Sequence, residues 1–116
     1  TFVNLMLNAV NKRRLSLERL VAVLSTTPAK LYGLFPRKGC LQIGSDADFT
    51  IVDMHKTHTL QAAEMKTSCG WIPYEGWDLQ GKAVFTIIRG KPVMREDEVL
   101  DLSGYGKFVK RKGSPP

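Results

Sequence analysis

The first third of the chain has the apolar spacing of α-helices. In residues 1–11 apolar side chains recur at i, i+3, i+4, i+7 and i+8, which predicts a helix with one apolar stripe. Its members are Phe2, Leu5, Met6, Ala9 and Val10. A second helix is predicted from Ser16, whose hydroxyl can cap the first free amides. It has a wide apolar face, expected to be buried, made of Leu17, Leu20, Val21, Val23 and Leu24. A third, short helix is predicted with Thr27 as its cap, Pro28 at its first position and Gly33 as a left-handed stop.

After Pro36 the period changes to that of β-strands. A short strand is predicted over residues 47–52, between a turn at 44–46 and Asp53, and a weaker one over 57–62. Residues 63–80 read as an irregular loop anchored by Trp71, Tyr74 and Trp77. Residues 83–95 read as a hairpin with Gly90-Lys91 as its two-residue loop, and a last short strand includes Val99 and Leu100. Helices followed by antiparallel strands predict an α+β fold, either as one domain or as the junction between two.

Composition places the chain among globular proteins. It has 116 residues, 43% of them hydrophobic and 24% charged. No apolar run approaches the roughly 18 residues that span a bilayer, and no signal peptide precedes the first helix, so we expect a cytoplasmic protein without membrane contact. The helical pattern starts directly at Thr1, so we expect the chain to be a fragment of a longer protein.

A net charge of +6 raises the question of nucleic-acid binding. The positive charge gathers in the loop 12–14 and in the tail, at Lys107, Lys110, Arg111 and Lys112. Between these places acids and bases are mixed, and no basic stripe with interleaved aromatic residues is present for stacking bases. We therefore expect no nucleic-acid partner.

Candidate metal ligands are sparse. His55 and His58 are three apart, but alternation along a strand puts them on opposite faces. Cys40 and Cys69 lie outside any Cys-x-x-Cys spacing, so we expect reduced, buried or half-buried thiols, and the two cysteines with the two histidines fit no zinc module.

Candidate catalytic groups are equally incomplete. Asp46 and Asp48 are interpreted as turn-forming residues that accept bonds from nearby amides, with paired acid/base work as the alternative. The serines at 16, 25, 45, 68 and 103 lack a nucleophile elbow, and the glycines at 33, 39 and 44 make no phosphate-binding loop. We assign no catalytic, cofactor-binding or metal-ligating residue to this segment.

Four sequence elements together resemble a known family. They are the helices from Leu15 to Leu34 with Pro28-Ala29-Lys30-Leu31-Tyr32-Gly33, the segment Lys38-Gly39 to Gly44-Ser45-Asp46-Ala47-Asp48, the loop and hairpin from Trp71 to Lys91, and the ending from Gly104 to Arg111. In this order they are similar to the C-terminal part of the cyclic amidohydrolases, the group of dihydropyrimidinase, hydantoinase and dihydroorotase. The chain would then be a fragment of such an enzyme.

The resemblance implies a fold and an activity. It implies that residues 1–35 are the last helices of a (β/α)8 barrel, that 36–103 are C-terminal strands of a composite β-sandwich, and that 104–116 form a basic tail. In such enzymes two divalent metal ions, usually zinc, are held at the barrel strand ends, and metal-bound hydroxide opens a small cyclic amide. Those strands lie outside this chain, so Lys30 and Lys38 are not the family's carboxylated lysine. A homodimer or homotetramer is implied.

Two alternatives stay open at this point. Within the superfamily, a dihydroorotase or an allantoinase is possible instead of a dihydropyrimidinase or hydantoinase, because the substrate-reading loops are missing. The second alternative belongs to another class of protein, in which the chain is a stand-alone, non-catalytic interaction module. An isolated fragment is expected to expose its apolar helix stripe, whereas a module is expected to fold alone as a monomer.

Overall fold

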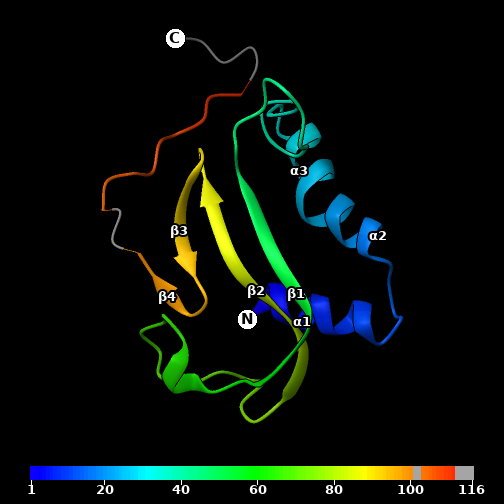
Figure 1. The fold of residues 1–116 in the computed structure, drawn as a ribbon, viewed down its shortest axis with the longest axis vertical. Helices are drawn as coiled ribbons and strands as arrows, with labels where there is room; N and C mark the ends of the chain where they lie inside the picture. The colour runs from blue at the N-terminus through cyan, green and yellow to red at the C-terminus, as the bar shows by residue number, and fades with distance from the viewer. Residues whose placement is uncertain (101–102, 112–116) are drawn as a thin grey trace.

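The computed structural model describes residues 1–100 and 103–111. Figure 1 shows a four-stranded antiparallel sheet in the order β1-β2-β3-β4, with α1 crossing one end of the sheet and a helical column standing beside β1. The α+β class with an antiparallel sheet is confirmed. No helix in the described ranges is long and apolar enough to cross a membrane. Lys112 and the rest of the predicted tail beyond Arg111 lie outside the described residues.

Helix α1 (Phe2–Asn11) is docked on β2 by one leucine and two asparagines. Leu7 is 2% exposed, and Gly81 of β2 approaches it so closely that a Cβ there would lie 2.8 Å from the Leu7 Cβ. Asn11 Nδ2 donates to carbonyl oxygens of both β1 and β2, each at 2.9 Å. The predicted stripe is only partly covered, since Phe2 is 60% exposed and Leu5 is half-buried against the core of the loop, while the buried residue of the helix is Leu7, which lies outside the stripe.

The second and third predicted helices form one helical segment. It comprises α2 (Leu17–Val21), a π-helical turn η1 (Ala22–Thr26) and α3 (Thr27–Leu31). Ser16 caps it as predicted, because its Oγ accepts from Arg19 N at 3.1 Å. Thr27 does not cap a new helix, since Thr26 and Thr27 both have helical dihedral angles and the chain continues without a break. The widened turn accommodates Pro28, whose ring and missing N–H disturb a regular α-helix.

The helical segment is less buried than predicted. Leu20 and Ala29 are buried, but much of the apolar face is exposed, with Leu17 at 41%, Val21 at 51% and Val23 at 44%. The glycine stop is confirmed, because Gly33 has a φ of 68°. The segment contacts α1 and the loop that follows α3.

Strand β1 (Phe49–Thr59) is longer than predicted. The two predicted strands, 47–52 and 57–62, are one strand that pairs with β2 (Asp78–Ile88) and has an irregularity between Asp53 and Thr57. Asp53 Oδ1 accepts from His55 N at 2.8 Å and from Lys56 N at 3.2 Å, which satisfies the amides of the bulge. The sequence predicts that this aspartate ends a strand, whereas it stabilises an interruption within one.

The hairpin of β2 and β3 (Lys91–Arg95) turns one residue earlier than predicted. Ile88 pairs with Lys91, so the loop is Arg89-Gly90. Both residues have positive φ, 46° and 77°, as in a type I′ turn. The last short strand is present as β4 (Glu98–Val99), which includes Val99 as predicted but ends before Leu100.

The loop between β1 and β2 is anchored by Ile72. After the 3-10 turn η2 (Ala62–Glu64), Ile72 packs with Leu60 and Leu79 in a small core, against which Tyr74 also packs. Trp71 and Trp77 are 64% and 53% exposed, so the prediction that both tryptophans are anchors is wrong. Trp77 makes an edge contact with Tyr74, whose ring centroid is 5.1 Å away.

Candidate functional site

The loop between α3 and β1 holds a cluster of ion pairs. Lys38 Nζ lies 2.8 Å from Asp46 Oδ2 and also donates to Asp48 Oδ2, while Arg37 Nε donates to Asp46 Oδ2 at 3.0 Å. Partial burial opposes the charge of Lys38, but its bonds to the two carboxylates raise its pKa above the usual value. The hydrogen bond from Lys38 lowers the pKa of Asp46. Lys38 and Asp46 therefore stay charged at neutral pH.

Asp48 also ties this loop to the far end of the sheet. Its Oδ1 accepts from the backbone N of Arg89 at 2.7 Å, and Gly90 N donates to Ala47 O at 2.9 Å. The predicted bond from an aspartate to a backbone amide is present, but the amide is 41 positions away rather than nearby. Because Asp46 Oδ2 and both oxygens of Asp48 are engaged in this way, we interpret the two carboxylates as structural links.

The same loop is fastened to the helical segment. Thr26 Oγ1 donates to Gly39 O at 2.8 Å, and a Cβ on Gly39 would lie 2.5 Å from the Ala29 Cβ. Ser45 Oγ and Cys40 Sγ both donate to Pro36 O, at 2.7 and 3.3 Å. The loop is thus fixed at one end to a helix and at the other to a hairpin turn.

The two histidines lie apart, as predicted from strand alternation. His55 is exposed and His58 is half-buried under α1, where Asn4 Nδ2 lies 3.3 Å from His58 Nε2. Burial, with nearby Lys82, lowers the pKa of His58. His58 Nδ1 is buried and has no hydrogen-bond partner in the described part of the chain.

The other candidate ligands do not converge. Both cysteines are free thiols, with Cys40 half-buried and Cys69 exposed, which contradicts the expected burial of the latter. A hydrogen bond with Thr67 lowers the pKa of Cys69. Lys30 Nζ lies 5.1 Å from the ring centroid of Phe35, and Lys38 is held in its ion pairs. Over residues 1–100 and 103–111, no three His, Cys, Asp or Glu side chains are placed to hold a metal ion.

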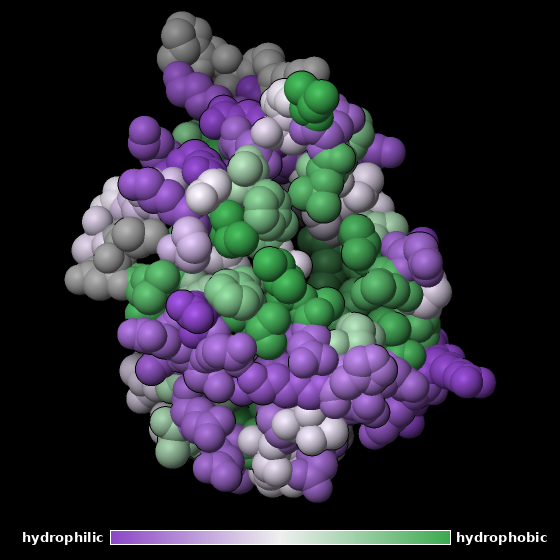
Figure 2. Space-filling model, in the orientation of Figure 1, coloured by the Kyte–Doolittle hydropathy of each residue, from purple (hydrophilic) through white to green (hydrophobic). Residues whose placement is uncertain are grey.

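Apolar side chains are concentrated on one face of the molecule. Figure 2 shows them gathered across the middle of this face, around a hollow between the sheet and the helical column. We use "apolar helix face" for Leu17, Val21 and Leu24, which recur at i, i+4 and i+7 and are 41%, 51% and 36% exposed. Phe49 and Ile51 of β1 are 37% and 47% exposed. Such contiguous apolar surface is typical of an interaction site.

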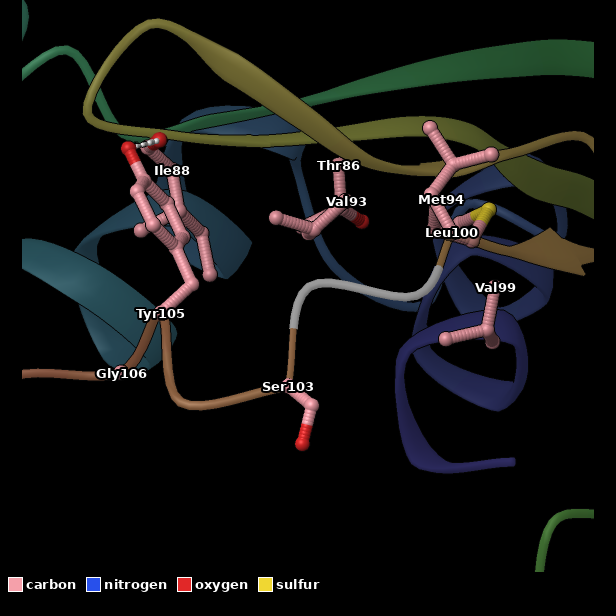
Figure 3. Close-up of a pocket in the computed structure, with 9 residues that line it drawn as sticks. All are labelled: Thr86, Ile88, Val93, Met94, Val99, Leu100, Ser103, Tyr105 and Gly106. Carbon is pink, nitrogen blue, oxygen red and sulfur yellow. Dashed lines mark hydrogen bonds between the residues drawn. The ribbon is translucent and has the colours of Figure 1, made fainter.

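An open apolar groove lies along the β2–β3 hairpin. Its volume is about 690 Å³, and Figure 3 shows Tyr105 at one end with its hydroxyl directed at Ile88. The lining residues are Thr86, Ile88, Val93, Met94, Val99, Leu100, Ser103, Tyr105 and Gly106. Most of the described lining residues are apolar, and the Tyr105 hydroxyl among them is bonded to Ile88 O, so we assign no reactive group to the described part of the groove.

Comparison with known proteins identifies the family. The model of the amidohydrolase family matches residues 1–93. The chain belongs to the amidohydrolase family. The resemblance inferred from the four sequence elements is thereby confirmed. The lengths of the amidohydrolase relatives show what share of such a protein this chain covers.

The relatives are several times longer than this amidohydrolase segment. L-hydantoinase from Paenarthrobacter aurescens is 45% identical over 105 residues, which are 90% of this chain and 23% of the relative. Dihydroorotase from Pyrococcus furiosus is 44% identical over 111 residues, 96% of this chain and 26% of the relative. The solved L-hydantoinase (dihydropyrimidinase) of Arthrobacter aurescens superposes with a TM-score of 0.90 at 44% identity, covering 93% of this chain and 24% of that one. The chain spans about a quarter of the length of these relatives.

Two groups of residues that organise the amidohydrolase segment are absent from the sequence-based expectations. One is the pair Arg89 and Tyr105, in which the guanidinium lies 4.2 Å from the ring centroid. The other is the pair of asparagines, Asn8 and Asn11, that bond from α1 to the strands. Neither has a local signal, because each partner is distant in sequence. The one available hint is the position of Asn8 and Asn11, three apart on the same side of a helix.

Proposed function

We propose that the polypeptide to which this segment belongs is a hydrolase that opens cyclic amides by cleaving a ring carbon–nitrogen bond. The observation that carries the proposal is the match, at 45% and 44% identity over nearly the whole chain, to an L-hydantoinase and a dihydroorotase. Both names denote enzymes acting on cyclic amides. Because the two identities are nearly equal, they support the substrate class rather than one ring.

The family is generally metal-dependent. We propose that the parent enzyme uses two divalent ions whose ligands all come from outside this segment. Among the described residues the donor sets do not fit a metal centre: Asp46 and Asp48 are paired with Lys38, and His55 is exposed whereas His58 is half-buried. No step of the hydrolysis is therefore assigned to residues of this segment.

The proposed role of the segment is to join and cover the catalytic domain. Residues 1–35 would be the last helices of the barrel, residues 36–103 part of a β-sandwich, and residues 104–116 a basic tail. Two features support this division. The apolar helix face is left uncovered by the described residues, and β1 pairs with β2 on one side only, leaving an edge on which a sandwich sheet can continue. A homodimeric or homotetrameric assembly is part of this proposal.

A ring-opening assay of the complete polypeptide tests the proposed activity. Hydantoin, dihydrouracil and dihydroorotate are supplied separately, and ring loss is followed by ultraviolet absorbance and by detection of the carboxylate product. The proposal predicts turnover of at least one ring, loss of that turnover after chelation, and recovery with added divalent metal. Absence of turnover with all three rings in the metal-loaded polypeptide would contradict it.

A further inference from the structure

The turn between β2 and β3 places an arginine where a small residue is usual. Arg89 has a φ of 46° and Gly90 a φ of 77°, and a type I′ turn favours Asn-Gly at these two positions. A long side chain in the left-handed region is uncommon and disfavoured. An arginine at this position therefore points to a role for its side chain.

That side chain holds Tyr105, which follows the sheet in sequence. The Arg89 guanidinium carbon lies 4.2 Å from the centroid of the tyrosine ring, and Arg89 Nη2 donates to the Tyr105 carbonyl oxygen. The Tyr105 hydroxyl donates to Ile88 O at 3.0 Å, as the dashed line in Figure 3 shows. Lys91 Nζ lies 5.3 Å from the same ring. The end of β2, the turn and the start of β3 thus all contact one tyrosine.

The other side of the same turn is held by the loop before β1. Asp48 Oδ1 accepts from Arg89 N at 2.7 Å, and Ala47 O accepts from Gly90 N at 2.9 Å. Arg89 therefore contacts the loop through its backbone and Tyr105 through its side chain. Residues 103–111 contain no helix or strand of their own, and the contacts of Tyr105 link this segment to the sheet.

We propose that Arg89 and Tyr105 form a strap that fixes the course of residues 103–111 over the β2–β3 turn. Arg89 is retained in the turn, despite its backbone conformation, because its side chain clamps the tyrosine. Asp48 fixes the backbone of Arg89, so the strap is linked to the ion-pair cluster of Lys38 and Asp46. The strap sets where the basic residues Lys107, Lys110 and Arg111 emerge from the fold.

Limited trypsin digestion of the complete polypeptide tests the strap. The measured quantity is the initial rate of cleavage after Lys107, two residues beyond Tyr105, divided by the rate in the exposed loop 12–14, with both products quantified by mass spectrometry. The loop serves as an internal reference, since global loosening raises both rates whereas release of the strap raises only the first.

Arg89→Asn is the decisive variant, because asparagine accepts the left-handed conformation and preserves the turn while removing the guanidinium. The ratio is expected to rise at least about threefold, the scale of losing a single cation–π contact. Arg95→Asn is the matched control, since Arg95 lies on the same hairpin and faces Phe85 rather than Tyr105, and it should leave the ratio unchanged.

Two tyrosine variants separate the contributions to the strap. Tyr105→Ala is expected to raise the ratio at least as much as Arg89→Asn, and Tyr105→Phe, which keeps the ring and loses the hydroxyl, should give an intermediate value. A ratio for Arg89→Asn equal to that of the unsubstituted polypeptide would overturn the proposal. So would an equal rise with Arg95→Asn, because the effect would then follow hairpin charge rather than the contact with Tyr105.

Discussion

The contact between α1 and β2 depends on the absence of a side chain at Gly81. A Cβ there would lie 2.8 Å from the Leu7 Cβ and 3.2 Å from Asn11 Nδ2, and Gly81 has a φ of 101°. Gly81→Ala therefore combines two costs. The left-handed backbone costs about 1 kcal/mol. The forced contact with a Cβ that cannot swing away costs about 1–3 kcal/mol, as for overpacked cores. The sum is a loss of about 2–4 kcal/mol in the free energy of unfolding.

Gly44→Ala separates these two costs. Gly44 has a φ of 92°, and a Cβ there would have no atom within 4 Å, so it carries the backbone cost alone. We expect urea denaturation, followed by tryptophan fluorescence, to give Gly81→Ala a midpoint about 1 M below that of Gly44→Ala, since a slope of about 1–3 kcal/mol per M is usual. Equal midpoints for the two variants would refute the claim that Gly81 is required for the close approach of the helix.

Three further predictions concern single groups. Asp48→Ala leaves the Arg89 amide without its acceptor and should lower the free energy of unfolding by about 1–3 kcal/mol, and Asp48→Asn should lower it less because an oxygen remains. Equal urea midpoints for Asp48→Ala and Asp48→Asn would contradict this. Thr26→Val should lower the free energy of unfolding by about 1 kcal/mol, because it removes the hydrogen bond to the Gly39 carbonyl oxygen, whereas Thr27→Val should change the urea midpoint little. A larger loss of stability with Thr27→Val than with Thr26→Val would indicate that Thr27 caps a helix. The pKa of His58 is lowered, so the neutral form is favoured in the fold, and the contribution of His58 to stability should be full above about pH 6.5 and fall as pH drops below it. His58→Asn should flatten the decline in urea midpoint between about pH 7.5 and 5.5, and an unchanged decline would assign it to other groups.

Local signals in the sequence predict several elements correctly. Ser16 caps its helix, Gly33 ends the helical segment in the left-handed region, and a hairpin follows the long loop. Each of these features depends on residues within a few positions of one another. They can therefore be found without knowledge of tertiary contacts.

The errors have a common physical origin in distant contacts. Leu7 is buried because Gly81, far along the chain, allows the helix to approach, and periodicity within the helix cannot detect that. The hairpin loop is predicted one residue late because Arg89 is an unusual residue for a positive φ, and its contact with Tyr105 lies 16 positions away. Trp71 and Trp77 are predicted as anchors on grounds of size, whereas Ile72 fills the small core.

We propose that this amidohydrolase segment packs, through its apolar helix face, on the catalytic remainder of a cyclic-amide hydrolase. The most direct measurement compares ring-opening turnover by complete polypeptides carrying Val21→Asp or Arg19→Asp. Val21 is apolar and 51% exposed here, whereas Arg19 is an exposed charged residue in the same helix. We expect Val21→Asp to abolish most turnover, because it buries an unpaired carboxylate in this contact, and Arg19→Asp to retain it. Full turnover by the Val21→Asp polypeptide would show that the apolar helix face does not pack on the catalytic remainder.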